Sequence, residues 1–93
     1  MPPTISTSTV SRRYRGRYYS ETRVRFDDVP PPPYREALKQ YGFRWHRRGQ
    51  YWYAPASIAR ATVCDCLSGH CTDLDTIAMH VGECEAEARC GII

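Results

Sequence analysis

The chain has 93 residues, of which 13 are Lys or Arg and 10 are Asp or Glu, giving a formal net charge of +3. This length allows one domain with a modest core, and without a long apolar run or a secretory leader the sequence predicts a soluble, cytoplasmic protein with no membrane partner. The charge is uneven, because residues 1–50 hold eleven basic and four acidic residues whereas residues 51–93 hold two and six.

The first segment, residues 1–17, is rich in Ser, Thr, Pro and Arg and has no apolar periodicity. This composition predicts a flexible basic arm, which could still fold onto a polyanion. We therefore expect a single α+β domain over residues 18–93. Its first strand is predicted near Val24 and Phe26, because these residues alternate with arginines.

Three helices follow from periodicity and capping signals. The first begins within the four prolines 30–33 and ends at Gly42, with apolar residues at helical spacing in PYREALKQYG. The second begins at Ser57, a good N-cap residue. The third is predicted from a capping box of Thr72 and Asp75.

Between the first two helices, GFRWHRRGQYWYAP predicts a β-hairpin that turns at residues 47–50. With a four-residue loop, Trp45 faces Trp52 on the buried side of the sheet. A three-residue loop would instead place Trp52 beside Arg44, and we prefer the first register because it buries both tryptophans. The predicted fold is a three-stranded antiparallel sheet in β-α-β-β order, packed on one face by about three helices.

The predicted core combines the apolar residues of these strands and helices. It contains Val24, Phe26, Leu38, Phe43, Trp45, Trp52, Ile58, Val63, Leu67, Leu74, Ile77 and Val81.

The opposite, open face of the sheet is the predicted binding site. Arginine supplies twelve of the thirteen cations and suits phosphate contacts, although a GC-rich genome would give the same bias. Tyrosine rings offer stacking surfaces for bases, so the face favours nucleic acid, single strands in particular. A solvated face or a homodimer interface are the other interpretations. The residues are Arg23, Arg25, Arg44, His46, Arg47, Arg48, Tyr51 and Tyr53.

The segments RVRF, PYREALK, GFRW, HRRG and YWY, over residues 23–55, resemble a strand-helix-hairpin module of small phage, plasmid and conjugative-element proteins. The resemblance implies a role near DNA-handling enzymes. In that module the structural signature corresponds to Leu38, Gly42, Phe43, Trp45 and Trp52, and the variable basic positions correspond to Arg44, Arg47 and Arg48.

Small phage proteins also act by binding host machinery. Inhibitors of bacterial immunity, anti-CRISPR proteins among them, are commonly of this size and without enzymatic activity. The alternative function is therefore an inhibitor or adaptor that binds a host protein or ribonucleoprotein complex.

Five cysteines lie between Cys64 and Cys90. Their spacing does not match a zinc finger or ribbon, so we expect reduced thiols that act as small core residues, with no metal and no cofactor. Zinc remains an alternative for a cluster of Cys64, Cys66, His70, Cys71, His80 and Cys84. The chain has no phosphate-binding glycine loop, H-E-x-x-H motif or nucleophile elbow, and the sequence predicts that it is not an enzyme.

Overall fold

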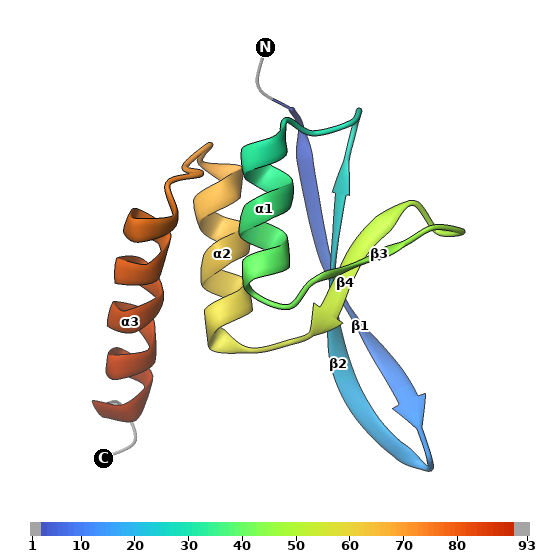
Figure 1. The fold of residues 1–93 in the computed structure, drawn as a ribbon. Coiled ribbons are helices and arrows are strands. Elements are labelled where there is room, and N and C mark those ends of the chain that lie inside the picture. Colours follow the sequence, from blue (N-terminus) through green and yellow to red (C-terminus); the bar gives the residue numbers. More distant parts are fainter. Residues whose placement is uncertain (1–2, 91–93) are drawn as a thin grey trace.

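The computed structural model describes residues 3–90 and has an α+β fold, with a four-stranded antiparallel sheet and three helices (Figure 1). The ends of the predicted arm and domain, residues 1–2 and 91–93, lie outside the described residues. The strand order in the sheet is β1-β2-β4-β3. In chain order the elements are β1 (Ile5–Tyr14), β2 (Arg17–Phe26), α1 (Pro32–Gln40), β3 (Arg44–His46), β4 (Tyr51–Pro55), α2 (Ile58–Ser68) and α3 (Leu74–Cys90).

The prediction of three strands was wrong, because residues 5–14 form β1 instead of an irregular arm. β1 pairs with β2 from Ile5↔Phe26 to Tyr14↔Arg17. The two strands are joined by Arg15 and Gly16, whose φ angles of 52° and 80° are those of a type I′ turn. Most residues of β1 are polar and exposed on both faces, so backbone hydrogen bonds to β2 stabilise this strand. Its sequence has no apolar alternation that would predict a strand.

The helix α1 starts on prolines, with Pro at its first positions and no side-chain cap. It ends in a Schellman motif, in which Phe43 N–H donates to the Leu38 carbonyl (3.0 Å) and Gly42 N–H donates to the Lys39 carbonyl (3.1 Å). Gly42 supplies the required positive φ of 85°. Leu38 and Phe43 are both buried, so the motif also directs the chain into the core.

The helices lie on one side of the sheet (Figure 1). α2 contacts α1 and the strands, whereas α3 packs mainly against α2 and forms an outer layer. The core lies between the sheet and the first two helices and extends to α3 through Ile77 and Val81. Among the described residues, no helix combines the length and the apolar character needed to cross a bilayer.

Three predicted core residues are exposed instead. Trp45 is 45% exposed, Ile58 47% and Leu74 40%. Trp45 lies on β3, the edge strand, where no further strand covers its outer side. Ile58 and Leu74 are each the first residue of a helix, where the neighbouring turn that would cover the side chain is missing.

The start of α3 also differs from the predicted capping box. The carboxylate of Asp73, not the Thr72 side chain, accepts hydrogen bonds from the Thr76 hydroxyl (2.6 Å) and the Thr76 N–H (3.3 Å). These hydrogen bonds lower the pKa of Asp73. For α2 the prediction is confirmed, because the Ser57 hydroxyl accepts from Arg60 N–H at 3.1 Å.

Two substitutions on α2 test the revised core. Leu67 is fully buried, so Leu67→Ala is expected to lower the free energy of unfolding by about 2–5 kcal/mol. Ile58→Ala removes a similar number of atoms from an exposed position and is expected to cost less than about 1 kcal/mol. Urea denaturation measures both, and equal losses would contradict the burial described here.

Candidate nucleic-acid interface

The register of the sheet places the predicted site residues on the face opposite the helices. β3 pairs with β4 through Arg44↔Tyr53, Trp45↔Trp52 and His46↔Tyr51, which confirms the predicted four-residue loop. β2 pairs with β4 through Arg23↔Tyr53. Because directly paired residues share a face, Arg23, Tyr53 and Arg44 form one row across three strands.

Tyr51 is the centre of this face and is only 7% exposed. The His46 ring stacks on it, with the centroids 4.7 Å apart and an angle of 10° between the planes. The guanidinium carbons of Arg23 and Arg25 lie 4.6 and 4.9 Å from its centroid. β2 and β3 flank β4 on opposite sides, so cations and imidazole cover the two faces of the ring. Tyr51 therefore organises its neighbours and does not offer a free stacking surface.

The loop between β3 and β4 is tied to the same cluster. Gly49 N–H donates to His46 Nδ1 (2.8 Å), and Arg25 Nη1 donates to the Gly49 carbonyl (3.2 Å). A Cβ atom at Gly49 would overlap the Tyr51 ring, so only glycine fits without a shift of neighbouring atoms. These contacts hold the loop while Arg47 and Arg48 stay exposed.

Glu21 is the acid of this face and is 5% exposed. Its carboxylate pairs with Arg23 Nε at 2.9 Å. Arg23 is therefore committed to Glu21 and Tyr51, and Tyr53 and His46 are half-buried. The predicted site residues that are exposed are Arg25, Arg44, Arg47 and Arg48.

Part of the predicted arm forms an exposed basic hairpin. Residues 11–20, which we name the basic ribbon, are the distal part of the β1–β2 hairpin and are all exposed. β4 pairs only with residues 21–24 of β2, so the ribbon projects beyond the sheet (Figure 1). It carries Arg12, Arg13, Arg15 and Arg17, and residues 1–20 contain no acidic residue.

The ribbon continues the open face. In the β1–β2 register, Arg12 pairs with Tyr19 and Ser8 pairs with Arg23, so Arg12 and Arg23 share the helix-free side. Tyr14 and Tyr18 are 63% and 72% exposed, and each has a ribbon arginine over its ring. The sequence signal for the ribbon was an Arg-Gly turn between tyrosine-containing segments of similar length.

The cysteine-rich third of the chain shows no comparable site. Burial, and after it the charge of Asp65, raises the pKa of Cys64 to about 11, so this thiol is not an activated nucleophile. Burial and the neighbouring Cys71 raise the pKa of Cys66. Among the described residues, no three His, Cys, Asp or Glu side chains are grouped so that they could hold a metal ion. The side chain of Cys90 lies outside the described part.

Comparison with protein-family models, with curated proteins and with solved structures found no match to this chain. The resemblance of residues 23–55 to a mobile-element module stays a prediction.

The packing of Gly49 is tested by substitution. Gly49→Ala is expected to lower the free energy of unfolding by about 1–3 kcal/mol, because its methyl group would overpack the Tyr51 ring. Gly82→Ala is the matched control, since a Cβ atom there meets nothing within 4 Å. Because Gly82 lies within α3, Gly82→Ala is expected to raise the free energy of unfolding by about 0.5–1 kcal/mol. If both variants gain stability in urea denaturation, the packing described for Tyr51 is wrong.

Proposed function

We propose that this protein binds nucleic acid through the basic ribbon and the helix-free sheet face, without catalysis. The observation that carries the proposal is the ribbon itself, in which four arginines and no acid lie on an exposed two-stranded hairpin. Cations concentrated on a projecting element bind phosphates with little cost in desolvation and attract a polyanion over a distance.

The exposed cations of the sheet support the same function. Arg25, Arg44, Arg47 and Arg48 are exposed, and the Tyr51 cluster holds the segments that carry them. Because the backbone of these segments is already held, phosphate contacts require the ordering of the arginine side chains alone. The resemblance of residues 23–55 to a module of mobile-element proteins favours a DNA-related role as well.

The choice between single and double strands depends on separate features. On the helix-free side, stacking on bases would use Tyr14 and Tyr53, because the Tyr51 ring is covered, whereas Tyr18 faces the other side of the ribbon. A two-stranded β-ribbon also fits the major groove of duplex DNA, which is about 12 Å wide. The predicted preference for single strands therefore depends on whether these tyrosines contribute.

The test is a fluorescence-anisotropy titration with 5′-hydroxyl oligonucleotides, single-stranded and duplex, at several salt concentrations. In the double variant Arg12→Ala, Arg17→Ala, affinity for both forms is expected to fall at least tenfold at low salt. On duplex, the slope of log K against log salt should flatten by about 2, since each lost phosphate contact removes about 0.9. Arg47→Ala with Arg48→Ala should act in the same direction.

Two controls separate charge from fold. Arg12→Lys with Arg17→Lys keeps the charge and should restore most of the salt slope, although it loses the planar fork. Gln40→Ala, an exposed change on α1, should leave binding as in the native chain. Full affinity and an unchanged slope in the ribbon alanine variant would contradict the proposal.

A host-protein inhibitor or adaptor of the anti-CRISPR type is the second candidate. The exposed tyrosines of the ribbon favour it, since Tyr and Arg are enriched in protein interfaces as well. This function predicts a stoichiometric complex that survives nuclease treatment of a host lysate, and its loss in Tyr14→Ala, Tyr18→Ala. Nucleic-acid binding alone predicts that nuclease abolishes co-purification.

A further inference from the structure

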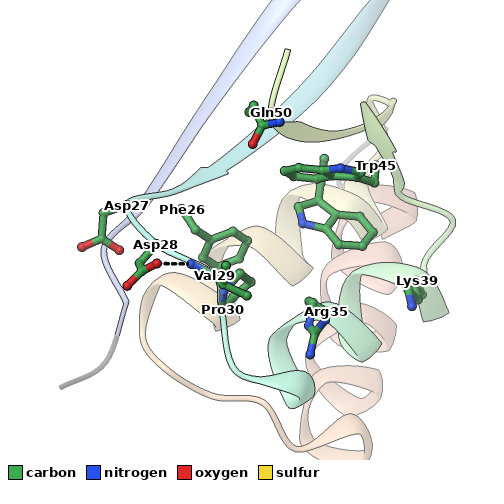
Figure 2. A pocket seen from close by; sticks show the side chains of 10 residues that line it. Phe26, Asp27, Asp28, Val29, Pro30, Arg35, Lys39, Trp45 and Gln50 are labelled. Atoms are coloured by element: carbon green, nitrogen blue, oxygen red, sulfur yellow. Dashed lines mark hydrogen bonds between the residues drawn. The ribbon is translucent and has the colours of Figure 1, made fainter. Parts of the chain in front are cut away.

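A groove of about 570 Å³ lies on the helix side of the sheet, away from the proposed interface. It runs between α1, the end of β2 and the β3–β4 hairpin (Figure 2). Its volume falls within the range of about 300–1,000 Å³ that is typical of small-molecule sites. Both tryptophans of the chain, Trp45 and Trp52, line it.

The wall of the groove is aromatic. Trp52 is buried, whereas Trp45 is 45% exposed and lies against it with a centroid separation of 5.5 Å. Phe26, which also lines the groove, packs edge-on against Tyr34 of α1. Trp45 therefore offers an indole surface that is supported from behind and open to a planar ligand.

The floor carries two cations. Arg35 and Lys39 are four residues apart on α1, so both side chains lie on the same side of the helix. Figure 2 shows Arg35 below Trp45. Arg35 Nε is buried and has no hydrogen-bond partner, and neither cation forms an ion pair with any side chain that the structure describes. A guanidinium that lines a groove without a carboxylate partner is available to pair with an anionic ligand.

The acids of the groove lie at its other end. Asp27 accepts a hydrogen bond from Thr4 N–H (3.0 Å), and Asp28 accepts one from Val29 N–H (2.7 Å). In Figure 2 both acids lie at the opposite end of the groove from Trp45. The part of the groove beside Trp45 is therefore positively charged.

We propose that this groove binds a nucleoside 5′-monophosphate, with the base against Trp45 and the phosphate at Arg35 and Lys39. An aromatic surface next to a guanidinium and an ammonium group complements a planar ring that carries a phosphate. The ligand is a free nucleotide or the 5′-phosphorylated end of a strand. The inference does not depend on the proposed function, because the groove and the basic ribbon share no residue.

The test is a titration of the full chain with adenosine 5′-monophosphate, followed by tryptophan emission. Because both tryptophans line the groove, a change in their emission reports binding at this site. We expect a saturable change with the monophosphate and at least tenfold weaker binding of adenosine and of inorganic phosphate. Adenosine binding as tightly as the monophosphate would overturn the assigned role of the cations.

Substitutions locate the phosphate. Lys39→Ala and Arg35→Gln are each expected to weaken binding of the monophosphate at least tenfold. Gln40→Ala is the matched control, since Gln40 is exposed on the same helix but does not line the groove. Arg35 is part-buried, so its substitution can affect folding. Lys39 is exposed, and Lys39→Ala is expected to keep the native fold, which circular dichroism checks. Unchanged binding in Lys39→Ala would overturn the proposal.

A second arm distinguishes the source of the nucleotide. It compares a 5′-phosphorylated trinucleotide with its 5′-hydroxyl form in the ribbon variant Arg12→Ala, Arg17→Ala, in which ribbon binding is weaker, so that the difference between the two forms reports the 5′-phosphate. A change in emission with the phosphorylated form alone, without a response to the free monophosphate, assigns the groove to a strand end. No saturable response to either ligand would overturn the proposal.

Discussion

The register of β4 between β2 and β3 is the constraint on which the rest of the molecule depends. It places Val24, Trp52 and Trp45 in one row that faces the helices. Because side chains alternate along a strand, the neighbouring residues in sequence face the other way. Arg23 and Arg44 therefore lie together on the helix-free face. A shift of one residue would turn the cations toward the helices and the tryptophans toward the solvent. The same pairing therefore builds the core and both proposed binding surfaces.

The helix-free face is organised around a ring that does not itself face solvent. Tyr51 is covered by His46 on one side and by Arg23 and Arg25 on the other. Cation–π contacts of this kind are worth about 0.5–2 kcal/mol. They offset part of the electrostatic repulsion between the two neighbouring arginines. Glu21 neutralises Arg23, whereas Arg25 beside it stays exposed and Arg44, Arg47 and Arg48 lie on the edge strand and its loop. The face thus acts as a support for cations more than as a stacking platform.

The two proposed sites suit ligands of different shape. The basic ribbon projects and has no concave surface, so it suits an extended polyanion whose affinity depends on salt. The groove beside Trp45 is concave and is bounded by Arg35 and Lys39, so it suits a single compact anion with a ring. α1 makes this possible, because it packs Leu38 into the core and supplies both cations from the adjacent flank of the same helix.

The sequence by itself determined the elements whose signals are local. The proline start and glycine end of α1, the Ser57 cap of α2 and the facing of Trp45 and Trp52 all followed from short-range rules of backbone geometry and alternation. Only the tertiary structure decided the rest. The strand Ile5–Tyr14 forms because β2 provides hydrogen-bond partners for its backbone. Its polar side chains do not predict this pairing. The covering of Tyr51, and the groove in which Trp45 stays exposed, depend on which elements meet in space, and no local pattern in the sequence encodes that.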